Sequence, residues 1–307
     1  MPTPHDVVLC LGETMAMLTT RGTHPVETAE DFTLDIGGAE SNVACHLANL
    51  GHRAAWFGAV GTDPLGRRVL DRLASAGVDV SLATQRDDAP TGLYVKDPGA
   101  GVTYYRRGSA ASRLGPDDLA SVAWSGVRLL HLSGITTALS PSNRALVHAA
   151  MAAAKAHGVT VSFDVNHRPA LWASTEDAAA ELAAAARLAN VVFVGRDEAE
   201  TVWGTTTAAS IRADLFPRTP LLVVKDSDVA AHEFGPDGDV SLPAPVVDVV
   251  EPVGAGDAFA AGWLDAFLRG APASERLARG HARAALALGS VHDVPLQNTT
   301  TGADHDG

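Results

Sequence analysis

Short apolar runs rich in β-branched residues alternate with segments of helical periodicity along most of this 307-residue chain. The runs with the length and composition of buried strands are residues 7–12, 54–60, 127–133, 159–165, 190–195 and 220–225. The segments with helical patterns are residues 41–51, 64–77, 140–158 and 175–189. Because strands and helices alternate in this way, the sequence predicts a three-layer α/β fold, with helices on both faces of a mostly parallel central sheet.

Two segments depart from this alternation. Residues 14–36 and 91–107 combine the period-two pattern of strands with turn residues, and neither has a helical pattern. We interpret them as a small antiparallel β-sheet that forms a lid over the strand ends. The chain then forms one domain over residues 1–297, and the polar residues 298–307 are expected to be a disordered tail.

The charge balance limits the partners of the chain. Lys and Arg number 23 against 36 Asp and Glu, a formal net charge of −13, which disfavours nucleic acid and anionic membranes. Apolar runs are too short for a signal peptide or a membrane span. We therefore expect small-molecule partners, and also a homo-oligomer, because the open edges of a lid sheet favour a dimer or a larger assembly.

Cysteine and histidine usage indicates the compartment and the metal content. The only cysteines, Cys10 and Cys45, fall in apolar or helical segments and are interpreted as buried free thiols, which fits a reducing cytoplasm. The 12 histidines lack the short paired spacing of a zinc or iron site. We expect a cytoplasmic protein without a structural metal.

Residues 252–262, PVGAGDAFAAG, place Gly254, Ala255 and Gly256 directly before Asp257, at the start of a helix-like apolar run. The first turn of a helix leaves backbone N–H groups free to bind an anion such as phosphate. An acid in that turn is a poor neighbour for a bound phosphate, because the two negative charges repel. Its presence therefore indicates a chemical role, such as accepting the proton of an attacking hydroxyl. Asp257 is thus a candidate base, although the same residues also suit a plain turn with an aspartate cap.

A second glycine turn runs into a helix at residues 37–51, GGAESNVACHLANLG, and FGAVGTDPLG follows it. Together with GAGDAFAAG, these segments resemble the two signatures of the ribokinase-like carbohydrate kinases over nearly the whole chain. The resemblance implies a ribokinase-like fold, ATP and Mg²⁺ as cofactors, an anion hole at Gly254, Ala255 and Gly256, and Asp257 as the general base.

Arginines indicate the class of sugar. Residues 98–116 contain Arg106, Arg107 and Arg113 but no acid, in a chain that is otherwise strongly negative. Arg168 follows a predicted strand end, where sheets of this kind place ligand-binding residues. A guanidinium matches a carboxylate in a bidentate way, so Arg106 and Arg168 favour a sugar acid, whereas we interpret Arg107 and Arg113 as surface charges.

Within the family, the combination of GGAESN, YYRRGSA, DVNHRPALW and PVGAGD is most similar to the members that phosphorylate 2-keto-3-deoxygluconate. This resemblance implies transfer of the ATP γ-phosphate to the C6 hydroxyl of that sugar acid. The residues that it places at the substrate are Gly38, Asn42, Tyr94, Tyr104, Arg106, Arg168 and, on a looser match in GSVHDVPLQ, Asp293.

On the nucleotide side, the resemblance implies that Asn166, Glu198, Lys225 and Asp226 bind ATP, and that Glu198 acts indirectly on the metal. Gly195 stands where the family usually has an asparagine three residues before this glutamate. The segment 226–235, DSDVAAHEFG, occupies the place of a glycine-containing loop, and its first residue is aspartate instead of glycine. Acids at this place would repel nucleotide phosphates unless they point away or a metal intervenes.

Several functions therefore remain open from the sequence. The first is an ATP-dependent kinase of a sugar acid. The second is a kinase of a neutral sugar such as fructose or ribose. The third is a non-catalytic sugar-acid binder with a weakened nucleotide site, which the altered residues Gly195 and Asp226 favour.

Overall fold

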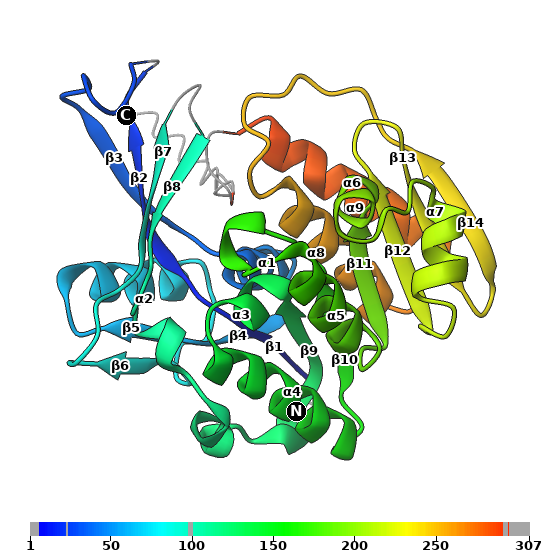
Figure 1. Ribbon diagram of the computed structural model, residues 1–307, viewed down its shortest axis with the longest axis horizontal. Coiled ribbons are helices and arrows are strands. Elements are labelled where there is room, and N and C mark those ends of the chain that lie inside the picture. The colour runs from blue at the N-terminus through cyan, green and yellow to red at the C-terminus, as the bar shows by residue number, and fades with distance from the viewer. Residues whose placement is uncertain (1–5, 23, 98–100, 291–293, 295–307) are drawn as a thin grey trace, which may run out of the picture.

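A computed structural model describes residues 6–22, 24–97, 101–290 and 294, and its arrangement is shown in Figure 1. The main sheet has eight strands in the order β14-β13-β12-β11-β10-β9-β1-β4. In that order, their bounds are Gly238–Pro243, Ala230–Gly235, Leu221–Asp226, Val191–Gly195, Thr160–Asp164, Val127–Ser133, Val7–Leu11 and Arg53–Phe57. All neighbours from β12 to β4 are parallel, and the β12–β13 and β13–β14 pairs are antiparallel.

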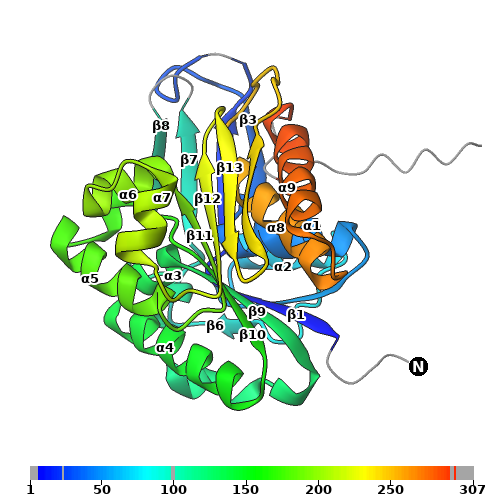
Figure 2. The same cartoon turned by 90° about the vertical axis from the view of Figure 1, so that its right-hand side faces the viewer.

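Helices cover both faces of this sheet (Figure 2). One face carries α1 (Ala39–Asn49), α2 (Pro64–Ser75), α8 (Ala255–Leu268) and α9 (Ala273–Leu288). The other carries α3 (Gly134–Ala138), α4 (Pro141–Ala156), α5 (Thr175–Ala186), α6 (Arg196–Trp203) and α7 (Ala208–Ser210). Short helical turns lie at Ala111–Arg113, Pro116–Ser121, Trp124–Gly126, Pro169–Leu171 and Ile211–Leu215.

The alternation of side chains along each strand creates a separate hydrophobic core on each face. In β1, Leu9 and Leu11 belong to the core beneath α4 and α5, whereas Val8 and Cys10 belong to the core beneath α1 and α8. Successive side chains of a strand point to opposite faces, so a strand in the middle of this sheet is mostly apolar on both of its faces. This explains why the strand runs were recognisable from the sequence.

The predicted three-layer fold with its mostly parallel sheet is confirmed, and the structure corrects two details of the main sheet. The run 54–60 is interrupted at Gly58: β4 ends at Phe57, and a separate short strand, β5 (Ala59–Gly61), pairs with β6 (Thr84–Arg86) outside the main sheet. The segment 226–235 was expected to form a loop, but it is the β12–β13 hairpin. Backbone pairing at the sheet edge extends both strands where the sequence carries polar residues.

The predicted smaller sheet is also present. Its four strands, in the order β3-β2-β7-β8, are Phe32–Gly37, Met15–Thr20, Leu93–Asp97 and Gly101–Tyr105. The expectation of a wholly antiparallel sheet is wrong, because its central strands β2 and β7 run parallel. These strands belong to two separate antiparallel pairs that lie side by side, so their directions are not set by a common tight turn. Asp293, a predicted substrate residue, and residues 298–307, the predicted disordered tail, lie outside the described residues.

The described part of the chain contains no helix that is long and apolar enough to cross a membrane. Cys10 and Cys45 are buried free thiols.

Candidate active site

The carboxyl ends of the parallel strands meet at one edge of the main sheet, and the candidate site is built there. The smaller sheet stands beside this edge (Figure 1). The first turns of α1 and α8 approach the same region and bring the two glycine-rich segments together, since Asn42 of α1 contacts Asp257 of α8.

Backbone geometry at the start of α8 requires glycine. Gly254 precedes the helix with φ 86° and ψ −11°, a left-handed conformation that costs other residues energy. Ala255 and Gly256 then begin the helix, and Asp257 follows in its first turn. Ala255 N donates to the carbonyl oxygen of Pro252 at 3.3 Å. The other N–H groups at the start of the helix are of the kind that can bind an anion, and the acid Asp257 lies beside them.

Asp257 is a half-buried carboxyl group with an unusual proton affinity. Burial raises its pKa from 3.8 to about 7, although the hydrogen bond from Asn42 opposes the shift, and the charge of Asp164 adds to it. Asn42 Nδ2 donates to Asp257 Oδ2 at 2.9 Å and orients the carboxyl group. A carboxyl group with a pKa near the ambient pH is suited to accept a proton during a reaction.

Two cavities meet at this turn. The larger, of about 800 Å³, lies over α8, α9 and the β12–β13 turn. The smaller, of about 440 Å³, lies between the smaller sheet, α1 and the ends of β10 and β12. Both have volumes typical of small-molecule sites. The residues that line both cavities are Arg168, Glu198, Lys225, Pro252 and Gly256, so a group bound at the anion turn is within reach of either cavity.

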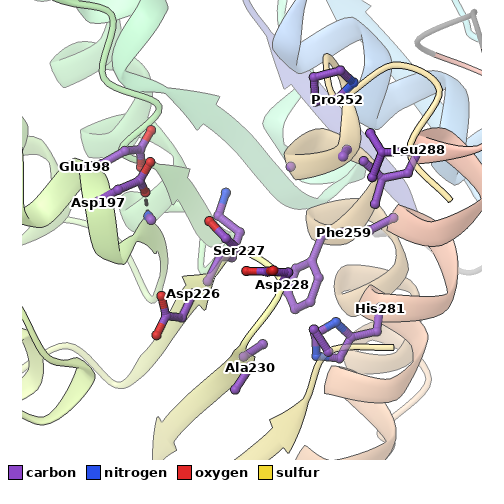
Figure 3. A pocket seen from close by; sticks show the side chains of 18 of the residues that line it. Asp197, Glu198, Asp226, Ser227, Asp228, Ala230, Pro252, Phe259, His281 and Leu288 are labelled. Carbon is purple, nitrogen blue, oxygen red and sulfur yellow. Dashed lines mark hydrogen bonds between the residues drawn. The ribbon is translucent and has the colours of Figure 1, made fainter. Parts of the chain in front are cut away.

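The walls of the larger cavity differ in chemistry (Figure 3). Phe259 and Leu288, from α8 and α9, give one wall an apolar surface, and the ring of Phe259 meets that of His281 edge to face, with centroids 5.3 Å apart. The opposite wall carries Asp197 and Glu198. An apolar slot for a flat base beside a polar region for phosphates is the arrangement that a nucleotide needs.

The acid at position 226 has a partner that the sequence did not reveal. Arg196 Nε donates to Asp226 Oδ1 at 2.7 Å, so the negative charge of Asp226 is compensated. The left-handed residue of this turn is Ser227, with φ 44°, one position after the place where a glycine was expected. Asp226 therefore repels a phosphate in the larger cavity less than the sequence alone suggested.

Lys225 brings a positive charge to the anion turn. A Cβ atom placed on Gly256 would lie 3.5 Å from Lys225 Nζ, and Nζ donates to Asp164 Oδ2 at 2.8 Å. Burial lowers the pKa of Lys225, but the carboxylates of Asp164 and Glu198 outweigh this effect and raise it. The ammonium therefore stays charged and can contact a phosphoryl group at the turn.

Glu198 is held by the backbone. Its two carboxylate oxygens accept from Gly195 N at 2.8 Å and from His167 N at 3.1 Å. Gly195, at the position where asparagine was expected, thus contributes its backbone N–H. Burial raises the pKa of Glu198, while the ammonium of Lys225 opposes this shift.

The donor set suits magnesium that arrives with a nucleotide. Within the described residues, no group of three histidine, cysteine or acidic side chains could hold a metal ion by itself. Magnesium in such sites commonly takes only one or two carboxylates and completes its shell with phosphate oxygens and water. Asp164 Oδ1 is buried and has no hydrogen-bond partner among the described residues. Together with Glu198 it would supply oxygen ligands of the chemistry that magnesium prefers.

The smaller cavity gathers most of the predicted substrate residues. Among its lining residues are Gly38, Asn42, Tyr94, Tyr104, Arg106 and Arg168. Asn166, which was expected on the nucleotide side, lines this cavity instead. It has a left-handed φ of 39° and is buried, and strained residues of this kind are concentrated at functional sites. Gly38 is needed for close approach, because a Cβ there would lie 2.2 Å from the carbonyl oxygen of Glu13.

The arginines differ in their environments. Arg168 is exposed and contacts the carbonyl of its neighbour His167. Arg106 is mostly buried and makes an ion pair with Glu13. Arg113 pairs with Asp88 at 2.9 Å in an exposed contact, and Arg107 is exposed. Part of the positive charge in residues 98–116 is therefore balanced by acids from other segments.

Two acids that line the smaller cavity, Glu13 and Asp164, were not among the site residues predicted from the sequence. Both lie at or just after the carboxyl end of a parallel strand, β1 for Glu13 and β10 for Asp164. The same positional rule had singled out Arg168. Applied to acids as well as to bases, it would have found both.

Comparison with known proteins places this site in a family context. The model of the pfkB family of carbohydrate kinases matches residues 6–297. The 2-dehydro-3-deoxygluconokinase of Bacillus subtilis is 36% identical over 300 residues, which cover 92% of this chain and 90% of that protein. The 2-dehydro-3-deoxygalactonokinase of Haloferax volcanii is 33% identical and covers 91% of this chain and 90% of its own length.

A solved structure extends the likeness to three dimensions. The crystal structure of 2-dehydro-3-deoxygluconokinase from Thermotoga maritima superposes with a TM-score of 0.86 at 25% sequence identity, covering 95% of each chain.

Proposed function

The chain belongs to the pfkB family of carbohydrate kinases, and from this premise we propose that it transfers the γ-phosphoryl group of ATP to the C6 hydroxyl of 2-keto-3-deoxygluconate or a closely related sugar acid. The observation that carries the proposal is the meeting of the two cavities at residues 254–257. There, an anion site, a base and a sugar-sized cavity adjoin one another.

In the proposed reaction, the sugar lies in the smaller cavity with its C6 hydroxyl toward Asp257. The carboxylate accepts the hydroxyl proton as the oxygen attacks the γ-phosphorus, and the bond from that phosphorus to the β–γ bridging oxygen breaks. ADP and the sugar 6-phosphate are the products, and the proton then leaves Asp257 for solvent. Asn42 keeps the carboxyl group oriented throughout, through its 2.9 Å hydrogen bond.

Charge stabilisation is assigned to the anion turn. The N–H groups of Gly254 and Gly256 are assigned to the transferred phosphoryl group, while Ala255 N donates to the carbonyl oxygen of Pro252 and holds the turn. Lys225 adds an ammonium at the same place. When bound with the nucleotide, magnesium supplies further neutralisation of phosphate charge, with Glu198 and Asp164 as the residues that would hold it directly or through water.

The choice of a sugar acid rests on the arginines of the smaller cavity. Arg106 and Arg168 both line it, and a guanidinium is suited to a carboxylate rather than to a neutral sugar alcohol. The relatives named for 2-dehydro-3-deoxygluconate and 2-dehydro-3-deoxygalactonate support the same class of substrate. A kinase of a neutral sugar is the second candidate, favoured by the compensation of Arg106 by Glu13.

The non-catalytic binder suggested by the altered nucleotide residues has lost its main support. Its strongest argument was the repulsion of ATP by Asp226, and that residue is paired with Arg196. A pure binder also has no need of Asp257 beside the anion turn.

The test is substrate-dependent release of ADP by the purified protein with ATP and Mg²⁺, across 2-keto-3-deoxygluconate, 2-keto-3-deoxygalactonate, gluconate, fructose and ribose. We expect release with the keto-deoxy acids, and a product whose phosphorus couples to the C6 protons in NMR spectra. Preferential release with fructose or ribose would favour the second candidate. No release with any of these compounds, from folded protein, would refute the proposal.

A further inference from the structure

Glu13 is a buried acid in the wall of the sugar-sized cavity, just after the end of β1. Its residue exposure is 2%, and its side chain is fully covered. Oε1 accepts from Ser109 Oγ at 2.6 Å, and Oε2 accepts from Arg106 Nε at 2.6 Å, with Arg106 Nη2 also against Oε2. Both oxygens are therefore satisfied by residues more than 90 positions away in the chain.

Arg106 is fixed from two sides. Its Nε and Nη2 groups form the edge that contacts Glu13, and the face of its guanidinium lies over the Tyr104 ring, with Cζ 5.4 Å from the centroid. A guanidinium has a second edge, formed by Nη1 and Nη2, that can also receive a carboxylate. Holding the first edge sets the direction in which the second edge points.

We propose that Glu13 is a positioning residue for substrate recognition: its carboxylate fixes Arg106 so that the second edge of the guanidinium meets the carboxylate of the sugar acid. The inference rests on the function proposed above and identifies how the site selects the acid. It also gives a reason for the compensation of Arg106 by an acid, which by itself favoured a neutral sugar.

Two effects of removing Glu13 oppose each other. Loss of its negative charge reduces repulsion of the substrate carboxylate, which would lower the KM for the sugar acid. Loss of the fixed contact leaves a long side chain that must be ordered on binding, which raises the KM. We expect the second effect to dominate, because the neighbouring guanidinium cancels much of the field of Glu13, whereas Glu13 is the acid that holds the Nε edge among the residues that the structure describes.

The experiment measures kcat and KM for 2-keto-3-deoxygluconate and ATP in the wild type, Glu13→Ala and Glu13→Gln. In Glu13→Ala, the KM for the sugar acid should rise roughly 10- to 100-fold, the effect of losing a charge-assisted hydrogen bond, while kcat and the KM for ATP change little. Glu13→Gln keeps the shape and an acceptor for Arg106, so a smaller rise is expected. It also provides a folded variant if Glu13→Ala leaves Arg106 too poorly compensated to fold.

A double-mutant comparison separates positioning from a general structural role. If Glu13 acts through Arg106, adding Glu13→Gln to Arg106→Ala should produce no further rise in the KM for the sugar acid. The matched control is Asp88→Asn, which removes the acid from the exposed pair with Arg113 and should leave all constants within about twofold.

The outcomes are distinct. A wild type that does not phosphorylate the sugar acid overturns the proposed function and this inference together. An active wild type whose Glu13 variants show an unchanged or lowered KM overturns this inference alone. Equal rises of the KM for the sugar acid with and without Arg106 would also overturn it, because Glu13 would then act independently of that arginine.

Discussion

Asp257 combines a reactive position with an electrostatic state suited to proton transfer. Burial is the main cause of its raised pKa of about 7. The charged groups around it are Asp164, which raises this pKa, and Arg168 and Lys225, which lower it. The balance keeps Asp257 available as a base at neutral pH and protonated in acid.

The first prediction concerns the pH dependence of the reaction. The base must be ionised, so kcat/KM for the sugar acid should fall tenfold per pH unit below a midpoint near 7, the pKa of Asp257. Initial rates between pH 5 and 9 with saturating ATP give this profile. A profile that is flat down to pH 5 would show that the reaction does not use a carboxylate with this raised pKa.

The same shift predicts a dependence of stability on pH. The pKa of Asp257 is higher in the folded chain than its ordinary 3.8, so its contribution to folding is greatest below 3.8 and is lost as the pH rises through about 7. Asp257→Asn removes this dependence. The Tm of the variant relative to the wild type should therefore be higher at pH 8 than at pH 5, and a difference that is the same at both values would contradict the account.

At the level of helices and strands, the sequence predicted what local chemistry determines. The strand runs were recognisable because both faces of the sheet are buried, and the glycine turn at 254–256 was recognisable because its backbone requires small residues. The β12–β13 hairpin was missed, because strand pairing at the sheet edge imposes an extended conformation on residues that look like a loop.

Pairings between distant segments could not be predicted from local patterns. Glu13 meets Ser109 and Arg106 only after the smaller sheet has formed beside β1. Arg196 meets Asp226 only because β11 and β12 are neighbours. Each pair changes the interpretation of a charge that the sequence had shown as isolated.

The carboxylate of Asp63 caps α2 and also binds the segment that leads into β7. Its Oδ1 accepts from Gly66 N at 2.8 Å, which caps α2, and its Oδ2 accepts from Thr91 N at 2.8 Å, just before β7. We predict that Asp63→Ala costs about 1 to 3 kcal/mol of folding free energy, because two backbone donors lose their partner.

Urea unfolding followed by circular dichroism measures this cost. Asp79→Ala is the control, because among the described residues the carboxylate of Asp79 accepts from one backbone donor, Ser81 N, in an exposed turn. A change of less than about 0.5 kcal/mol is expected there. An Asp63→Ala variant as stable as the Asp79→Ala control would contradict the assignment.

Considered as a whole, the molecule places a small sheet against the mouth of a sugar-sized cavity. Tyr94 and Tyr104 reach the cavity from β7 and β8. Lys96 Nζ, also on β7, lies 3.8 Å from Glu251 Oε2, which is three residues before the turn at 254–257. We propose that this sheet acts as a lid that excludes water during phosphoryl transfer and so limits hydrolysis of ATP.

The smaller sheet also supports a prediction about assembly. Within the described residues, its outer strands β3 and β8 pair on one side only, and Tyr105 on β8 is 62% exposed. Open edges of this kind favour pairing between copies, so light scattering should give a mass of about twice the 31.7 kDa of one chain.

A lysine on the edge should weaken this association. We expect Tyr105→Lys to shift the protein toward the monomer, whereas Leu188→Lys, at an exposed apolar position after α5, should not. A wild type that is monomeric at all concentrations would refute the prediction.

We have proposed that phosphoryl transfer takes place where the two cavities meet, with Asp257 as the base. The most direct test of this proposal is the turnover of Asp257→Asn with ATP, Mg²⁺ and the best sugar substrate, alongside calorimetric binding of both substrates to the same variant. We expect kcat to fall about 10²- to 10⁴-fold while both substrates still bind to folded protein. Near-normal turnover by this variant would contradict it.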